Sequence, residues 1–423
     1  MQESNARPSR HASLVAGAVV VVVVIIVVTA VPGVARAAGV QYTPIQLAGP
    51  WTPPEGSDGW RINNAGVVAG YSYHNTFGQA MRWSPVAGPP PSVQVTPLGH
   101  LGIRPGMGIP TSFADGLNNH GASVGWSTKV EGGVEKGSRA VLWAPASTDA
   151  IELPVLSLNE DGHSVNGAEA INDAGVIVGQ ARKHLSSFEI PFRPVRWDAV
   201  THEITELQML PGHEGNVPGH ARAINAGGTI IGDCAGTPVR WAAGSTTPVQ
   251  LKPIVIPTNG YLSQVWSIND AGTIVGNFSN FDLNGLYRAQ RWDANSTTGA
   301  YLPGTADATA YFATAYDINN AGQIVGMGWR GNQELAMFWD PDEPFAIDLN
   351  TLIPANSGWR LLAANSINED GWISGYGQYD PDGTGPEFWE GGVLLRPIPE
   401  PAALALALVA APVLLARRRR RPW

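Results

Sequence analysis

Few residues of this 423-residue chain stand at the spacings that catalysis or metal binding requires. Segment 121–125 reads Gly-Ala-Ser-Val-Gly, which has the letters of the Gly-x-Ser-x-Gly nucleophile elbow. That elbow turns from a strand into a helix, and no helical pattern follows Ser123, so we expect a structural role for it. The nine histidines include no His-Glu-x-x-His pair, and His213 and His220 stand seven apart in a loop rich in Gly and Pro. We therefore predict no catalytic residue, no metal site and no cofactor.

The acidic segments and the single cysteine are also weak candidates for metal binding or catalysis. Segments 159–162, 340–343 and 380–383 carry oxygen ligands that suit Ca²⁺, but none matches the twelve-residue calcium loop, and we interpret them as solvated turns. Cys234 stands alone, so it forms no intramolecular disulfide. We expect it to be a small packed residue just after a strand at 229–232.

Aromatic residues are the remaining candidates for ligand binding, because the chain has 15 Trp. Trp126 and Trp329 lie outside the repeated Trp positions described below. We expect both in the variable loop that follows a hairpin, where ligand contacts are common. They are our candidate ligand contacts, and packing is the alternative role.

One unit recurs seven times along the chain. The pattern Ile/Leu-Asn-x-x-Gly-x-x-x-Gly starts at residues 62, 117, 171, 224, 268, 318 and 367, and each copy has a Trp after a further short apolar segment. Asn favours turns and Gly adopts positive φ, so these residues predict a hairpin, and the Trp predicts packing between units. The structural repeat residues are Asn63, Gly66, Trp83, Asn118, Gly121, Trp143, Asn172, Gly175, Trp197, Asn225, Gly228, Trp241, Asn269, Gly272, Trp292, Asn319, Gly322, Trp339, Asn368, Gly371 and Trp389.

Each repeat is long enough for about four short antiparallel strands, with the fourth expected in segments such as 204–210, 249–254 and 346–349. Such a sheet must stack on its neighbours to bury its faces. We therefore predict an all-β fold, a β-propeller of seven blades over residues 38–398, and a linear β-solenoid is the alternative. Segment 40–47 resembles a fourth strand but precedes the first repeat. We expect it to close the ring in the seventh blade, alongside or in place of 392–398.

Both ends of the chain read as targeting segments. Residues 1–37 combine an early basic region, an apolar run and Ala35-Arg36-Ala37, which predicts a signal peptide cut after Ala37. An uncleaved anchor is the alternative, because the run is long enough to span a bilayer. Residues 399–423 contain a Pro-Glu-Pro motif, an apolar stretch at 402–416 and five terminal arginines, which predicts a transmembrane helix with a cytoplasmic basic end. The sorting residues are Pro399, Glu400, Pro401, Arg417, Arg418, Arg419, Arg420 and Arg421.

These patterns resemble two bacterial families. The tail resembles the PEP-CTERM sorting signal of Gram-negative bacteria, which implies an exosortase as partner, transient membrane anchoring, and delivery to the cell surface or extracellular matrix. The hairpin with its trailing Trp resembles the HAF repeat of extracellular proteins across about residues 40–398, which implies an exported β-repeat protein but no enzymatic activity. Small departures occur, such as Ala226 where other copies have Asn, Asp or Glu.

The net charge of residues 38–398 further limits the classes of partner. The chain has 26 basic and 35 acidic residues, of which eight basic and two acidic lie outside 38–398, leaving 18 basic against 33 acidic side chains. Such an acidic body is no nucleic-acid binder. We expect an exported, non-enzymatic binding or scaffold protein whose ligand is extracellular polysaccharide, with signal peptidase and an exosortase as processing partners. The alternative is a carbohydrate-active hydrolase or lyase with acidic residues at the propeller channel.

Overall fold

The computed structural model describes residues 40–51, 56–74, 77–106, 108, 110–185, 188–213, 215, 217–253, 261–280, 286–307, 310–383 and 389–398. The predicted signal peptide with Ala35 and Ala37, and the sorting segment 399–423 with its helix, lie outside these residues. Within the described part of the chain, no helix is long and apolar enough to cross a membrane.

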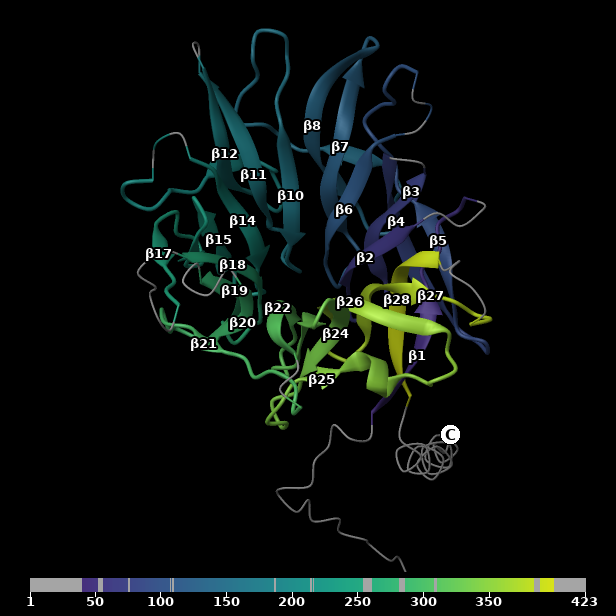
Figure 1. Cartoon of the computed structure of the whole chain (residues 1–423). Helices are drawn as coiled ribbons and strands as arrows, with labels where there is room; N and C mark the ends of the chain where they lie inside the picture. The colour runs from purple at the N-terminus through teal and green to yellow at the C-terminus, as the bar shows by residue number, and fades with distance from the viewer. Residues whose placement is uncertain are drawn as a thin grey trace, which may run out of the picture. The chain divides into compact units, whose positions relative to one another are not determined.

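The described chain forms seven four-stranded antiparallel sheets, which confirms the all-β, seven-bladed propeller (Figure 1). Blade 1 contains β2 (Ser57–Ile62), β3 (Val68–His74), β4 (Phe77–Val86) and β5 (Ser92–Pro97). Blade 2 contains β6 (Ser112–Leu117), β7 (Ser123–Glu131), β8 (Val134–Trp143) and β9 (Ala150–Glu152). Blade 3 contains β10 (Asn166–Ile171), β11 (Ile177–Leu185), β12 (Phe188–Trp197) and β13 (Ile204–Glu206). Blade 4 contains β14 (Gly219–Ile224), β15 (Ile230–Cys234), β16 (Thr237–Trp241) and β17 (Pro248–Gln250).

The remaining blades follow the same order. Blade 5 contains β18 (Tyr261–Ile268), β19 (Ile274–Asn280), β20 (Leu286–Trp292) and β21 (Ala300–Tyr301). Blade 6 contains β22 (Ala310–Ile318), β23 (Ile324–Arg330), β24 (Gln333–Trp339) and β25 (Ile347–Asp348), followed by the 3-10 turn η3 (Leu349–Leu352). Blade 7 contains β26 (Trp359–Ile367), β27 (Ile373–Tyr379), β28 (Trp389–Ile398) and β1 (Gln41–Gln46). The first strand of each blade lines the channel, and the fourth strands are shorter than the sequence predicts.

The two ends of the described chain close the ring together. β1 pairs antiparallel with β28, from Gln41 opposite Ile398 to Gln46 opposite Val393. Segment 40–47 therefore joins the seventh blade alongside 392–398, because β28 is the third strand of that blade and β1 is the fourth. This pairing removes two free sheet edges and ties the first repeat to the last.

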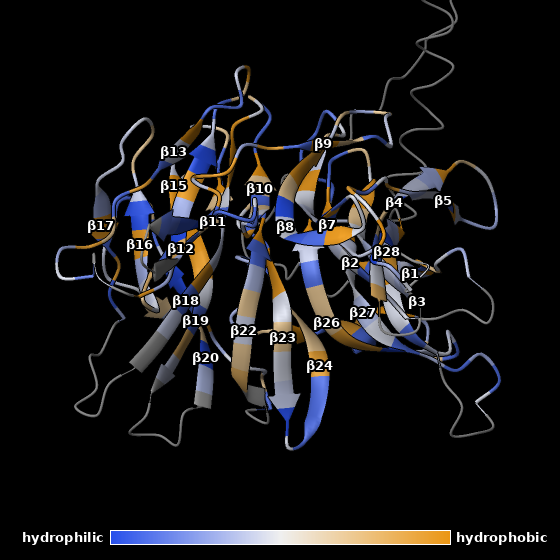
Figure 2. Cartoon of the chain, turned by 90° about the horizontal axis from the view of Figure 1, so that it is seen from above, coloured by the Kyte–Doolittle hydropathy of each residue, from blue (hydrophilic) through white to orange (hydrophobic). Residues whose placement is uncertain are grey.

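Apolar residues of facing blades form the core. Figure 2 shows apolar stretches within the strands and polar ones at loops and strand ends, as in β24. The repeat Trp contributes to this packing through both its ring and its N–H group. Trp197 of blade 3, for example, is fully buried, and its indole N–H donates to the carbonyl oxygen of Pro154 behind blade 2 at 2.9 Å. The same bond, at 2.7–3.1 Å, is made by Trp83, Trp143, Trp241, Trp292 and Trp339.

The seventh blade departs from this rule. The six repeat Trp residues above pair with the first residue of the second strand, as Trp197 does with Ile177. In blade 7 the residue in that position is Leu395, opposite Ile373, whereas Trp389 begins β28 and packs edge-on against Trp359. Assigning Trp389 as the seventh repeat Trp was therefore wrong.

Candidate functional site

The seven repeat asparagines form a closed hydrogen-bonded ring around the channel. Each Asn side chain is at least 93% buried and donates its Nδ2 to the backbone carbonyl of the Asn in the next blade, at 3.0–3.2 Å. Each Oδ1 also accepts the backbone N–H four residues later, as Asn172 does from Val176 at 3.0 Å. One amide group thus holds its own hairpin and links two blades. An Asp lacks the donor, and a Gln would place the amide one bond too far.

The two glycines of the repeat serve different purposes. The first, three residues after the Asn, has φ between +74° and +88° in all seven copies and completes the turn. The second, seven residues after the Asn, lies against the first strand. A Cβ there would stand only 1.9–2.3 Å from the carbonyl oxygen of the residue five before the Asn. This glycine is required because the first strand bulges toward it.

A β-bulge interrupts the pairing of the first and second strands in every blade, three residues before the Asn. A bulge inserts an extra residue and re-aims its side chain. The residues at this position differ from blade to blade, and we call them the bulge ring: Trp60, Asp115, Glu169, Arg222, Trp266, Tyr316 and Asn365.

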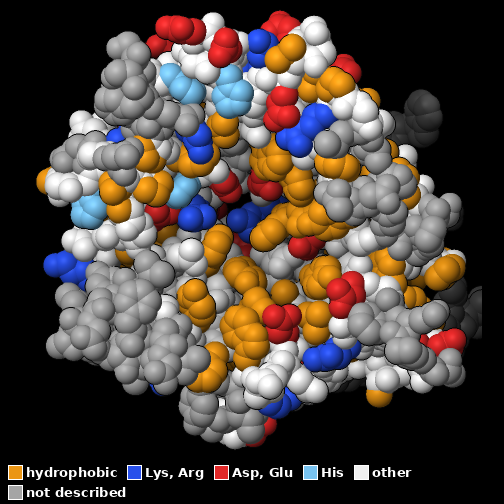
Figure 3. Space-filling model, turned by 45° about the horizontal axis from the view of Figure 1, so that its top comes forward, with side chains coloured by type: hydrophobic (Ala, Val, Ile, Leu, Met, Phe, Trp, Pro, Cys, Tyr) orange, Lys and Arg blue, Asp and Glu red, His pale blue; other side chains and the backbone are white. Residues whose placement is uncertain are grey.

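The bulge ring lines a cavity of about 120 Å³ together with Arg61. Charged members come from blades 2, 3 and 4, whereas aromatic and amide members come from blades 5, 6, 7 and 1. Figure 3 shows this end of the ring hollowed at its centre, with acidic and basic side chains around the hollow beside a broad hydrophobic area. We call this cavity the channel mouth.

Neighbouring side chains hold several bulge-ring residues in place. Trp266 donates its indole N–H to Asn277 Oδ1 at 2.8 Å, and its ring lies 5.9 Å from that of Tyr316 in a T-shaped arrangement. The Arg222 guanidinium lies 5.0 Å over the Trp266 ring, and its Nε donates to Asp233 at 3.1 Å. Burial raises the pKa of Asp233, but hydrogen bonding to His220 and the charge of Arg222 bring it below the usual range. The aromatic side of the mouth is thus built from fixed rings.

Asp115 and Glu169 are the exceptions. Among the described residues, neither carboxylate has a hydrogen-bond partner, and both side chains are half-buried in the channel wall. Burial and the neighbouring negative charge of Glu169 raise the pKa of Asp115 well above its ordinary value, and Arg61 opposes this effect. Two adjacent carboxylates therefore face the mouth without a donor from the described part of the chain.

Asp58 lies on β2, two residues before Trp60. It accepts a hydrogen bond from Asn365 Nδ2 at 2.8 Å across the junction between the first and seventh blades. Burial raises the pKa of Asp58 to about 7, although hydrogen bonds from Asn365 and Tyr71 favour the charged form. The protonation state of Asp58 therefore affects a hydrogen bond at the junction where the ring closes.

The opposite end of the channel is wider, with a cavity of about 390 Å³ lined by the Asn ring and the residues that flank it. The residue after each ring Asn adds an outer set of bonds. Asp270 Oδ1, for example, accepts the backbone N–H of Ala226 at 2.9 Å. Six such bonds join neighbouring blades. The step from blade 3 to blade 4 lacks one, because Ala226 offers Asp173 no acceptor.

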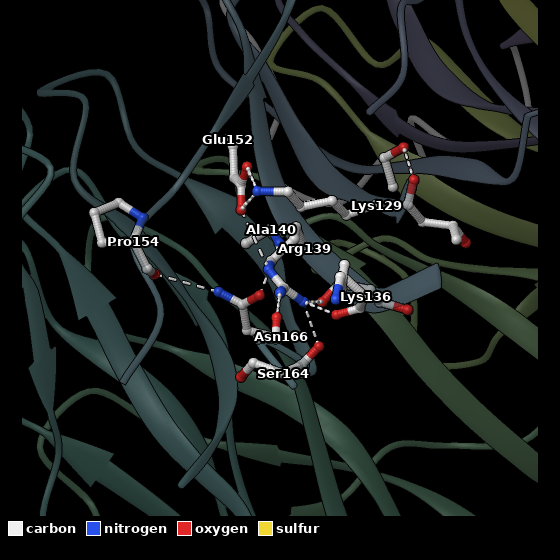
Figure 4. A network of polar contacts seen from close by, with 12 residues as sticks. Lys129, Lys136, Arg139, Ala140, Glu152, Pro154, Ser164 and Asn166 are labelled. Carbon is white, nitrogen blue, oxygen red and sulfur yellow. Dashed lines mark hydrogen bonds and ion pairs between the residues drawn. The ribbon is translucent and has the colours of Figure 1, made fainter. Parts of the chain in front are cut away.

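Two buried arginines form hydrogen bonds between the blades that carry the charged bulge-ring residues. Arg139 of β8 donates to the carbonyl oxygens of Lys136 at 2.6 Å, Gly162 at 3.0 Å and Ser164, and thereby holds the loop that enters blade 3. Figure 4 shows this network with Glu152, which also bonds Lys129. Arg193 repeats the arrangement from blade 3 to the loop entering blade 4. These two arginines join blade 2 to blade 3 and blade 3 to blade 4, which are the blades that supply Asp115, Glu169 and Arg222.

The residues singled out by sequence occupy other places. Trp126 and Trp329 stand within strands β7 and β23, not in loops, because these second strands extend past the hairpin pattern. Trp126 is half-buried and stacks on Phe113 at 4.7 Å. Neither Trp lines the channel mouth. Sequence reasoning missed the bulge ring. The available signal was a variable position at a fixed place in the repeat, three residues before the Asn.

The nucleophile and metal candidates have structural surroundings. Ser123 is fully buried and accepts a hydrogen bond from Arg82 at 3.2 Å. Cys234 lies inside β15 rather than after a strand, and burial raises the pKa of its thiol to about 11. In the three acidic segments, the first Asn or Asp caps its own turn. The described part of the chain contains no group of three His, Cys, Asp or Glu side chains placed to hold a metal ion.

No known family model and no curated protein matches this chain. Among solved structures, TolB from Acinetobacter baumannii matches at 12% identity and a TM-score of 0.32, over 68% of this chain and 52% of that one. This chain thus spans about half of the TolB chain. A protein of unknown function from Dyadobacter fermentans matches at 10% identity and a TM-score of 0.37, over 85% and 95%.

The α-L-arabinofuranosidase PaAbf62A from Podospora anserina, solved with cellotriose, matches at 10% identity and a TM-score of 0.26, over 81% and 98%. At these scores the likenesses carry no argument about function. Functional inference therefore depends on the channel mouth.

Proposed function

We propose that this chain is an exported, non-enzymatic β-propeller that binds extracellular polysaccharide at the channel mouth. One observation carries the proposal: the bulge position varies among Trp, carboxylic acid, Arg, Tyr and Asn side chains, while the turn, the ring Asn and both repeat glycines recur. Architecture explains a residue that repeats seven times. It does not explain seven side chains aimed into one cavity by the same backbone device.

The composition of the mouth suits a sugar. Fixed aromatic rings such as Trp266 present apolar faces, and Asn365 and the two carboxylates present polar groups. Binding sites for small ligands combine such apolar walls with a few placed polar groups. Sugars have both kinds of surface, since the ring C–H groups form apolar faces and the hydroxyls donate to carboxylates.

Co-sedimentation with extracellular matrix from the producing bacterium tests the proposal. We expect saturable pelleting of the purified protein, and a loss of about tenfold or more in apparent affinity for Trp266→Ala, as for a buried aromatic anchor. Phe345→Ala is the matched control, because Phe345 is an exposed aromatic residue that does not line the mouth. Equal pelleting of the two variants would place binding elsewhere, and Trp329→Ala would then test the second-strand Trp.

A second candidate function is a carbohydrate-active hydrolase or lyase. The observation that favours it is the Asp115–Glu169 pair, since a carboxyl with a raised pKa beside a second carboxyl is the arrangement of a general acid and its partner. Release of reducing or unsaturated sugar ends from matrix by the wild type, lost in Asp115→Asn, would replace the binding function with catalysis.

We also propose export through residues 1–37 and sorting through residues 399–423, with the protein ending at the surface or in the matrix of a Gram-negative bacterium. The support is the order of the Pro-Glu-Pro motif, apolar stretch and Arg417–Arg421. Replacing these five arginines with Ala should leave the tail uncleaved and the protein retained in the membrane. Normal release of that variant would refute sorting by this signal.

A further inference from the structure

Three charged side chains at the channel mouth have no partner among the residues that the structure describes. Asp115, Glu169 and Arg61 make no hydrogen bond or ion pair with any described residue, although all three line the same cavity. The other charges at the mouth are already engaged: Arg222 with Asp233, and Asp58 with Asn365.

These three groups leave one of the two carboxylates without a counter-charge when both are ionised. Burial in the channel wall makes that second negative charge costly, which is why the pKa of Asp115 is raised. A neutral ligand would leave this imbalance in place. A ligand that brings a single positive charge would remove it and provide hydrogen-bond donors for both carboxylates.

The aromatic side of the mouth suits a cation as well. Trp60, Trp266 and Tyr316 line the same cavity as the two carboxylates. Ammonium groups are attracted to the faces of such rings. The protein already uses this interaction on one face of Trp266, where the Arg222 guanidinium lies 5.0 Å from the ring centre.

We infer that the channel mouth binds a sugar that carries a free amino group, with the ammonium between Asp115 and Glu169 and the sugar ring against Trp266 and Tyr316. The inference rests on the proposed function and narrows its ligand to a deacetylated amino sugar. The small cavity suits a chain end or a side branch rather than a strand running through the channel. An N-acetyl group would remove the charge and its donors.

Calorimetric titration of the full chain, purified in detergent, tests this directly. The probes are a trimer of glucosamine and the same trimer fully N-acetylated, at about pH 6.5 and about 0.15 M salt, so that long-range attraction to the acidic surface is screened. We expect the amine trimer to bind at least about tenfold more tightly, which is the range for a charge-assisted contact in a desolvated site.

Variants assign the preference to the mouth. Asp115→Asn with Glu169→Gln should reduce the two affinities to within about twofold of each other, because both carboxylates lose their charge with little change of shape. Glu160→Gln with Glu203→Gln is the matched control, since it removes two exposed carboxylates elsewhere and should keep the preference. Circular dichroism and urea unfolding confirm that each variant folds, and Glu169→Gln alone serves if the double variant does not.

The possible results distinguish a failure of the amino-sugar assignment from a failure of the proposed binding function. Equal binding of both trimers, or a preference that survives in the Asp115→Asn, Glu169→Gln protein, overturns the amino-sugar assignment. Matrix pelleting that depends on Trp266 without binding of either trimer also overturns it, while the proposed function stands. Absence of both pelleting and trimer binding refutes the proposed function itself.

Discussion

Replacing one ring asparagine tests whether the repeat Asn is only a turn residue or also a link between blades. Asn172 donates Nδ2 to the Asn225 carbonyl at 3.1 Å and accepts the Val176 N–H at 3.0 Å. In Asn172→Ala, the Asn225 carbonyl keeps one partner, the N–H of Gly228. The loss there is about one net hydrogen bond, roughly 1 kcal/mol, and the Val176 N–H loses its acceptor at a cost of about 1–3 kcal/mol. We expect a total loss of about 2–4 kcal/mol in the free energy of unfolding.

Asn172→Asp separates the two roles. Aspartate still accepts the Val176 N–H, so a residue that only caps its turn would lose little. Its second oxygen, however, would take the place of the Nδ2 donor and lie at hydrogen-bond distance from the Asn225 carbonyl oxygen. A buried negative charge would then face another acceptor without a hydrogen bond between them. We therefore expect Asn172→Asp to be at least as destabilising as Asn172→Ala near pH 8. Protonation restores a donor, so the difference from wild type should shrink near pH 4.

Urea unfolding of residues 38–398, followed by Trp fluorescence at both pH values, is the measurement, because this segment contains all seven sheets and the pairing that closes the ring. The wild type at each pH is the reference. An Asn172→Asp protein as stable as wild type at pH 8 would refute the ring and leave the Asn as a turn cap alone.

Three further changes test other parts of the architecture. Gly276→Ala places a Cβ 1.9 Å from the Gln264 carbonyl, so we expect a loss above about 3 kcal/mol in urea unfolding, or misfolding seen by circular dichroism; tolerance would mean that the bulge is not rigid. Ala226→Asn gives the Asp173 N–H its missing acceptor and should raise stability by about 0.5–1 kcal/mol, and no gain would show that this outer bond contributes nothing. The raised pKa of Asp58, about 7, means that the folded protein binds its proton more tightly than the unfolded chain, so stability falls as pH rises from about 4 to about 7. Asp58→Asn should flatten that part of the pH–stability curve and stabilise the protein near pH 8 by on the order of 2 kcal/mol, whereas an unchanged curve would contradict the assignment.

Repeat counting predicts the architecture because a propeller blade is nearly a local structure. The turn at Asn172 to Gly175 and the strands beside it depend on neighbours in sequence, and seven copies of about 50 residues require seven stacked sheets. The segment at 40–47 could be assigned to closure for the same reason, since its pattern matches a fourth strand that its own repeat does not need. Trp389 shows the limit: a pattern search accepts any nearby Trp, whereas pairing register placed Leu395 in that position.

The candidate site could not be read in the same way, because its members are adjacent only across the channel. Trp60 and Trp266 stand more than 200 residues apart, and their shared place three residues before a repeat Asn does not reveal that their side chains line one cavity. The seven bulges turn one variable position per repeat toward a common axis. The unpaired carboxylates of Asp115 and Glu169 likewise become neighbours only when blades 2 and 3 pack side by side.

The amino-acid sequence by itself thus determined the number of blades, the hairpin in each and the segment that closes the ring, because turn chemistry and strand periodicity act over a few residues. Tertiary structure alone decided that the Asn amides join into a ring, that the second glycine makes room for a bulge, and which side chains meet at the channel mouth. The bulge depends on the pairing of the first two strands in each blade, whereas the Asn ring and the channel mouth depend on distances between blades. Those distances exist only after all seven sheets have stacked and β1 has paired with β28.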